Sequence, residues 1–230
     1  MHVLVREKVK NTMHRLDTFI FDLDHTLYDA NTGVFQDLHK RMSHYVSKLL
    51  DVDRPTADNI RKNLYETYGT TLNGLMNEYD IDPNPFFDYV HDVDLNMVHK
   101  CADTAEMIEN LPGRKLVYTN APLEHAINIL QHLEILDLFE AIFDLKAANL
   151  VPKPNVEPYE AFIQKYNITP ETSVMFEDSA KNLVPAARVG FKTVWLSYDR
   201  QPEDQYADAI DMVHPRLKDF LNHYYTQVQT

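Results

Sequence analysis

The chain has 230 residues, of which 44% are apolar, and its formal net charge at pH 7 is −13. The apolar content is enough for a folded core and argues against wholesale disorder. The negative charge argues against a general binder of nucleic acid polymers or membrane surfaces, because both need positive protein surface. Cys101 is the only cysteine, so no internal disulfide can form. No apolar run reaches transmembrane length and the first residues carry scattered charges, so we expect a cytoplasmic protein without a signal peptide.

The first expected element is a short buried strand over residues 17–24, "DTFIFDLD". From residue 31 to about residue 97, apolar side chains recur at helical spacing, interrupted by turn-forming stretches such as "DVDRPT" and "DPNP". This segment is therefore expected to be entirely helical.

From residue 100 onward, helices and strands are expected to alternate. The strands are expected over residues 115–121, 141–145, 173–179, 192–197 and 211–214. Such alternation indicates an α/β fold with a parallel sheet and helices on both faces. We expect a Rossmann-like core formed by residues 1–29 and 100–230, with residues 30–99 inserted as an all-helical cap domain.

Three of the expected strands end in pairs of polar side chains. The pairs are Asp22 with Asp24, Thr119 with Asn120, and Glu177 with Asp178. Each pair alone could be a solvated strand end. Because ligands bind beyond the carboxyl ends of the strands in such sheets, we expect the three pairs to converge on one crevice.

The carboxylates in this set suit metal-assisted chemistry. Asp22, Asp24 and Asp178 could supply the oxygen ligands that Mg²⁺ prefers, and a metal would relieve the repulsion between them. An ionised aspartate beside Mg²⁺ can attack phosphorus and form an aspartyl phosphate. A second carboxyl group two residues on could protonate the leaving oxygen and then deprotonate the attacking water.

A phosphate group also needs local positive charge, which the overall composition does not supply. Thr119 and Asn120 offer a hydroxyl and an amide donor to phosphate oxygens. Lys153, in the proline-stiffened stretch "VPKPN", adds a cation. The expected partner is thus a small phosphorylated metabolite.

Four segments resemble the four motifs of the haloacid dehalogenase superfamily. They are "DLDHT", "VYTNA", the lysine of "VPKPN", and "FEDSAKN", in the order that the superfamily has them. The resemblance covers essentially the whole chain after about residue 16, and it implies hydrolase chemistry that depends on Mg²⁺.

The resemblance also implies a role for each matched residue. Asp22 is the nucleophile, and Asp24 is the general acid and base. Asp22, the backbone carbonyl of Asp24 and Asp178 are implied as metal ligands. Glu177 is a neighbouring candidate, and Asn182 stands where the superfamily often has a second aspartate. The residues implied to hold the phosphoryl group are Thr119, Asn120 and Lys153.

Two longer stretches are similar to the pyrimidine 5′-nucleotidase branch of this superfamily. They are "YTNAPLEHAINILQHLEILDLFEAIFD" and, in the expected cap, "YETYGTTLNGLM". The similarity implies a phosphomonoesterase that hydrolyses pyrimidine nucleoside 5′-monophosphates, such as UMP and CMP, to nucleoside and phosphate. The cap residues expected to face the substrate are Tyr65, Tyr68, Thr70, Thr71 and Asn73.

Other functions stay open. A phosphatase for another small ester, such as phosphoglycolate or a sugar phosphate, or a phosphosugar mutase would use the same motifs. A 2-haloacid dehalogenase would not need Asp24 or Mg²⁺, and a binding module would not need the full set of motif residues. No zinc-type cluster of His and Cys occurs at ligand spacing. We therefore expect His25, His125 and His132 to be solvent-facing or partly packed.

Overall fold

One of the two central strands of the sheet is β1 (Thr18–Phe21), whose four residues are all buried. Its side chains alternate between two faces, so Phe19 and Phe21 enter one apolar cluster and Ile20 enters another. The computed structural model of the chain describes residues 15–228, and the expectation about a signal peptide concerns residues outside this part.

Six parallel strands form one sheet in the order β3-β2-β1-β4-β5-β6. The other strands are β2 (Arg114–Tyr118), β3 (Ala141–Phe143), β4 (Ser173–Glu177), β5 (Lys192–Leu196) and β6 (Met212–His214). The expected parallel α/β sheet is confirmed. Every strand except β6 ends one to three residues earlier than expected, so Asp22, Thr119 and Asp178 lie in the loops that follow the strands.

Helices cover both faces of the sheet, as expected. They are α6 (Ala102–Glu109), α7 (Leu123–His132), α8 (Glu157–Tyr166), α9 (Ala180–Arg188) and α10 (Leu217–Val228). Buried residues of α6, α7 and α10 share the apolar cluster of Phe19, whereas those of α8 and α9 share the cluster of Ile20. No helix within residues 15–228 is both long enough and apolar enough to span a membrane.

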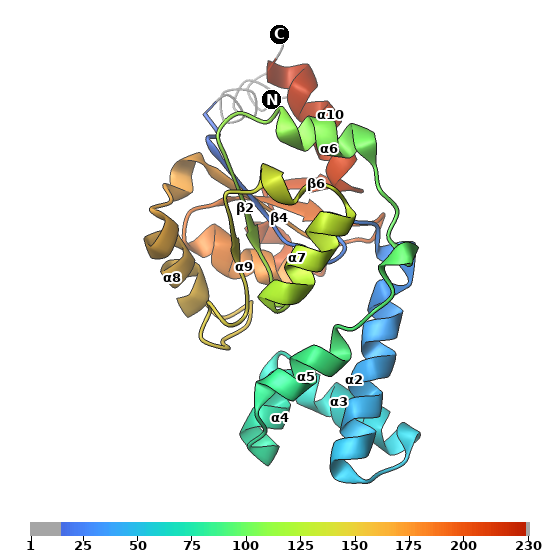
Figure 1. Cartoon of the computed structure of the whole chain (residues 1–230). Coiled ribbons are helices and arrows are strands. Elements are labelled where there is room, and N and C mark those ends of the chain that lie inside the picture. Colours follow the sequence, from blue (N-terminus) through green and yellow to red (C-terminus); the bar gives the residue numbers. More distant parts are fainter. Residues whose placement is uncertain (1–14, 229–230) are drawn as a thin grey trace.

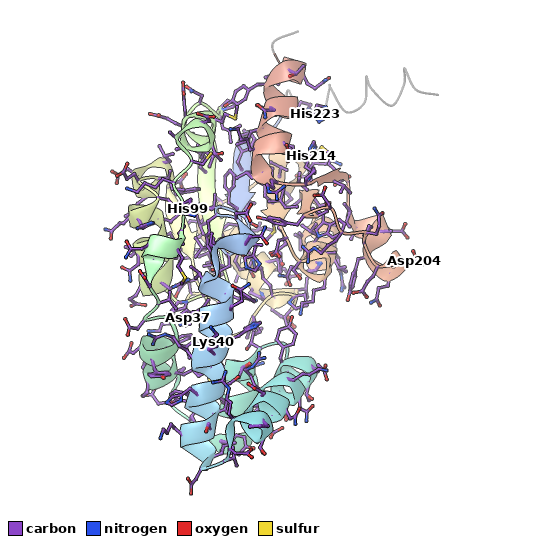
Figure 2. The ribbon with its side chains drawn as sticks, turned by 90° about the vertical axis from the view of Figure 1, so that its right-hand side faces the viewer. Asp37, Lys40, His99, Asp204, His214 and His223 are labelled. Atoms are coloured by element: carbon purple, nitrogen blue, oxygen red, sulfur yellow. The ribbon has the colours of Figure 1, made fainter. Side chains whose placement is uncertain are left out.

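Four helices lie between β1 and α6 in the chain, as the helical periodicity predicts. They are α2 (Val34–Leu50), α3 (Arg54–Tyr68), α4 (Thr71–Tyr79) and α5 (Pro83–Val90), and we call them the inserted helices. The side chains of Asp53, Thr70 and Asp82 cap α3, α4 and α5 by accepting a hydrogen bond from a backbone N–H in the first turn. Figure 1 shows the inserted helices at one end of the molecule, opposite α6 and α10, and Figure 2 shows the same separation from the side.

Candidate active site

The site lies at the carboxyl ends of three neighbouring strands. β1 pairs with β2 on one side and with β4 on the other, so the residues that follow these strands are brought together. A cavity of about 450 Å³ lies at this edge, between the sheet and the inserted helices. The motif residues that line it are Asp22, Asp24, Thr119, Asn120, Lys153, Glu177, Asp178 and Asn182.

Lys153 contacts two of the carboxylates in this cluster. It is only 2% exposed. Its ammonium group donates to Asp22 Oδ1 at 2.7 Å, to Glu177 Oε2 at 2.7 Å and to the carbonyl oxygen of Tyr118 at 2.9 Å. An ammonium group has three donors, so all of them are used. The other oxygen of Asp22, Oδ2, accepts the hydroxyl of Thr26 at 3.3 Å, which leaves the Asp22 carboxylate fixed on both sides.

Asn120 fixes the loop that carries Lys153. Its Oδ1 accepts the backbone N–H of Lys153 at 2.8 Å, and its Nδ2 donates to the backbone carbonyl of Lys153 at 3.2 Å. The hydroxyl oxygen of Thr119 accepts the backbone N–H of Ala121, which leaves its own hydrogen free to be donated. One hydrogen of the Asn120 amide is likewise left for a ligand, but much of this side chain serves the loop.

The cluster carries more negative than positive charge. Burial raises the pKa of Asp22 well above its usual value, the nearby carboxylates of Glu177 and Asp178 raise it further, and Lys153 opposes the rise. Burial also raises the pKa of Glu177, against the pull of Lys153. Lys153 and the exposed Arg200, whose guanidinium lies 3.7 Å from Asp178 Oδ2, face three carboxylates. Negative charge still exceeds positive charge, which is a local reason for the site to accept a metal ion.

The donor atoms fit Mg²⁺. Oxygens of Asp22, Glu177 and Asp178 lie within 4.8 Å of one another. Both oxygens of Glu177 are already used, because Oε2 accepts from Lys153 and Oε1 accepts the backbone N–H of Ser179 at 3.1 Å. Asp22 and Asp178 are therefore better placed to hold a hard cation than Glu177.

Asn182 offers a further oxygen beside this pair. The residue is buried, and its Oδ1 has no hydrogen-bond partner among residues 15–228. An orphaned buried oxygen that faces a cavity is suited to a metal ion or to a metal-bound water. Sequence reasoning left open whether Glu177 or Asn182 adds to the site, and the contacts favour Asn182.

Asp24 stands apart from the Lys153 cluster. One of its oxygens, Oδ1, accepts the hydroxyl of Tyr28. Burial alone would raise the pKa of Asp24, but the nearby ring of His125, with the hydrogen bond from Tyr28, lowers it to about 2. Asp24 therefore rests as a carboxylate, in the form that accepts a proton.

The inserted helices supply the opposite wall. Tyr65, Thr70 and Thr71 line the cavity, as expected for cap residues that face the substrate. The structure does not place Tyr68 and Asn73 on this wall. The Asn73 side chain donates to the backbone carbonyl of Tyr68 at 3.0 Å. This hydrogen bond links the end of α3 with the first turn of α4.

Sequence reasoning missed Arg61, which also lines the cavity. Its Nε donates to the hydroxyl of Ser43 at 3.0 Å, and within the described chain no carboxylate lies at ion-pair distance from it. Burial, and the charge of Arg61, lower the pKa of the neighbouring His39. One signal was available: Arg61 lies one helical turn before Tyr65 and so shares its face of α3.

The two walls touch at the mouth of the cavity. Lys181 of α9 donates to the hydroxyl of Tyr65 of α3, and its ammonium nitrogen lies 4.4 Å from the centroid of the Tyr65 ring. This contact joins the core to the inserted helices.

The sequence of the chain matches a known protein family and is similar to a known phosphatase. The model of the haloacid dehalogenase-like hydrolase family matches residues 19–196. The chain is 24% identical over 233 residues to the glyceraldehyde 3-phosphate phosphatase of Pyrococcus furiosus, covering 91% of this chain and 94% of that protein.

Solved structures share the fold, and two of them illustrate the similarity to this chain. A haloacid dehalogenase-type phosphatase from Thermococcus onnurineus superposes with a TM-score of 0.61 at 19% identity, over 90% of this chain and 97% of that one. The hydrolase YfnB from Bacillus subtilis, solved with magnesium bound and described as showing interdomain movement, superposes with a TM-score of 0.62 at 15% identity, over 91% and 99% of the two chains.

Proposed function

The chain belongs to the haloacid dehalogenase-like hydrolases, and from this premise we propose that it is a Mg²⁺-dependent phosphomonoesterase acting on pyrimidine nucleoside 5′-monophosphates such as UMP and CMP. One observation carries the proposal. Asp22 is held on one oxygen by Lys153 and on the other by Thr26, at the floor of a cavity that Asp24 also lines. A fixed carboxylate nucleophile with a second carboxylate two residues on suits phosphoester hydrolysis through a covalent intermediate.

The proposed reaction has two steps. An oxygen of Asp22 bonds to phosphorus while the bond from phosphorus to the ester oxygen breaks, and Asp24 gives that oxygen a proton. Asp24 then takes a proton from the water that hydrolyses the aspartyl phosphate. The hydroxyl of Thr119 donates to a phosphoryl oxygen as negative charge develops on it, and Lys153 stabilises this charge through its own positive charge.

Two conditions make these steps feasible. The charge of an incoming phosphate raises the proton affinity of Asp24, so that it can enter the first step as an acid despite its low resting pKa. Mg²⁺, held by Asp22, Asp178 and the backbone carbonyl of Asp24, would neutralise phosphate charge and keep Asp22 ionised.

The inserted helices act in this proposal as a cap domain. Residues 30–99 would close over a core of residues 1–29 and 100–230, exclude water from the first step and select the substrate. The position of the cavity between the two parts supports this division, as does the interdomain movement described for YfnB.

A pyrimidine nucleotide suits the cavity in size and chemistry. A volume of about 450 Å³ is within the usual range for small-molecule sites. Arg61 offers guanidinium donors on the wall opposite the sheet edge, where they can bind the O2 carbonyl that uracil and cytosine share and adenine lacks. The similarity of "YETYGTTLNGLM" to the nucleotidase branch also supports this substrate.

Phosphate release from a panel of esters tests the proposal. The panel is UMP, CMP, AMP, GMP, ribose 5-phosphate, phosphoglycolate and glyceraldehyde 3-phosphate, each with Mg²⁺ and with EDTA. We expect release from UMP and CMP that EDTA abolishes and added Mg²⁺ restores. Release from other esters alone would keep the mechanism and reject the pyrimidine substrate, and isomerisation with little phosphate release would identify a mutase.

A further inference from the structure

His125 is a buried histidine next to the proposed acid and base. It lies in the first turn of α7, shortly after the end of β2, and only 2% of its surface is exposed. The expectation of a solvent-facing or partly packed ring is wrong for this residue. The same face of α7 carries Ala126 and Ile129 into the core, and His125 goes inward with them.

The ring of His125 faces the carboxylate of Asp24. Its Nε2 lies 3.5 Å from Asp24 Oδ1, and it has no hydrogen-bond partner in the described part of the chain. A buried ring nitrogen without a partner is unfavourable, so a small rotation of Asp24 that completes this hydrogen bond would be stabilising. Catalytic hydrogen bonds are often long in structures without a ligand and shorten when the substrate binds.

The side chains of Tyr28 and His125 face the same oxygen of Asp24. Oδ1 accepts the hydroxyl of Tyr28 and faces His125, whereas no hydrogen bond or ion pair from residues 15–228 reaches Oδ2. Asp24 also lines the cavity. Tyr28 and His125 therefore hold the carboxylate by one oxygen and leave the other free for a ligand.

A histidine at the end of the inserted helix α5 packs against His125. The ring of His91, at the end of α5, lies 4.9 Å from the ring of His125, measured between centroids. Burial lowers the pKa of His91 to about 4, so its ring is neutral, and its Nδ1 lies 3.1 Å from the carbonyl oxygen of Phe87. A carbonyl can only accept, so this nitrogen carries the hydrogen and the ring is fixed in place.

We propose that His125 is a positioning residue for Asp24: with Tyr28, it holds the carboxylate in the orientation from which Oδ2 exchanges a proton with the leaving group. The inference rests on the proposed phosphoester hydrolysis, because that reaction gives Asp24 a leaving group to protonate. As the bond from Asp22 to phosphorus forms, the bond to the ester oxygen breaks, and this oxygen takes the proton from Asp24.

The leaving group provides the readout. An alkoxide leaves poorly without a proton, whereas p-nitrophenolate is stable enough to leave without one. Loss of the correct orientation of Asp24 should therefore slow departure of the leaving group from an alkyl phosphate such as UMP and spare this step for p-nitrophenyl phosphate. Because both esters share the later hydrolysis of the aspartyl phosphate, the comparison uses kcat/KM, which covers only the steps up to departure of the leaving group. A residue that only supports the fold would affect both esters alike.

The test compares His125→Phe and His125→Gln with wild type on these two esters. His125→Phe keeps a ring of similar size against His91 and loses the nitrogen. We expect kcat/KM for UMP to fall about 10²-fold, the size of a general-acid contribution, with kcat/KM for p-nitrophenyl phosphate within about threefold of wild type. His125→Gln keeps an amide donor and should recover part of the loss on UMP.

A matched control lies in the same helix. His132 is half-buried in α7, and its Nε2 lies 2.9 Å from the carbonyl oxygen of Val98, outside the cavity. His132→Phe should change both esters by the same small factor. If His125→Phe does not fold, as thermal unfolding would show, Tyr28→Phe removes only the other donor to Oδ1 and should give the same dependence on the ester.

The results separate this inference from the proposed function. Equal losses of kcat/KM on the two esters, or no loss on UMP, would overturn the role of His125. If wild type hydrolyses another alkyl phosphate of the panel and not UMP, the pyrimidine substrate is rejected and that ester replaces UMP in the comparison. A wild type that hydrolyses neither alkyl nor aryl phosphates would overturn both proposals.

Discussion

The two walls of the cavity are built in opposite ways. On the wall formed at the carboxyl ends of the strands, the residues Asp22, Lys153 and Glu177 are almost fully buried, and each is held by two or more contacts. On the inserted helices, Arg61 is half-buried and held through one serine, and Tyr65 is 45% exposed. A preorganised wall suits charge stabilisation in a reaction, and a loosely held wall suits adjustment to a substrate. Substitutions should therefore act on every substrate at the first wall and on selected substrates at the second.

The largest effect is expected for Asp22→Asn at the sheet edge. The variant keeps the size of the side chain, replaces one of its two acceptor oxygens by an amide group and removes the nucleophile, so phosphate release should fall by at least about 10³-fold for every ester in the panel. The matched control is Asp204→Asn, at an exposed residue that projects from the rim of the core in η5 (Asp204–Ala209) (Figure 2). Retained activity on any ester in Asp22→Asn would remove Asp22 from the chemistry.

Lys153→Met should damage both stability and activity. The substitution leaves Asp22 and Glu177 buried without their shared cation, and breaking a buried ion pair in this way costs about 3–5 kcal/mol in the free energy of unfolding. Denaturant unfolding would measure the loss. Lys40→Met, at an exposed position of α2 that Figure 2 labels, is the control.

The loss of stability in Lys153→Met should depend on pH in a defined direction. Burial already raises the pKa of Asp22 and Glu177, and removing Lys153 raises both further. The folded variant then binds more protons than the unfolded chain, so its stability falls as pH rises through these raised pKa values and recovers as pH is lowered. The double variant Lys153→Met/Glu177→Gln should be more stable than the single variant near neutral pH and still inactive. A destabilisation that grew toward low pH would contradict this account.

Arg61→Met tests the second wall. If Arg61 binds the base, kcat/KM for UMP and CMP should fall about 10- to 100-fold, the range for a lost hydrogen bond to a charged group. Ribose 5-phosphate has the same ribosyl phosphate without the base and should be hydrolysed at the wild-type rate. Arg54→Met, on the same helix and paired with Asp58 away from the cavity, is the control. Equal losses on both substrates would place Arg61 among the residues of the chemistry.

The same contrast explains how much the sequence could predict. The apolar runs of β1 and β4, each ending in acid, predict the parallel sheet, and the sheet topology brings Asp22 and Glu177 together. Arg61 and His125 were not predicted, because helical periodicity shows which residues share a face and does not show what that face meets. Tyr68 was expected at the cavity from its neighbours in sequence, but it does not line the cavity.

The smallest effect is expected where the two walls meet. Lys181→Met removes both contacts with Tyr65, a hydrogen bond and a cation–π contact, at an exposed mouth. Such a contact contributes about 0.5–1 kcal/mol, so KM for UMP should rise roughly two- to fivefold while kcat stays within twofold, because closure of the inserted helices becomes less favourable and the chemistry is untouched. Tyr65→Phe keeps the ring contact and should show a smaller rise. A fall in kcat at unchanged KM would instead mean that Lys181 acts on the reacting phosphate, and the division between a wall for chemistry and a wall for selection would then not hold at this point.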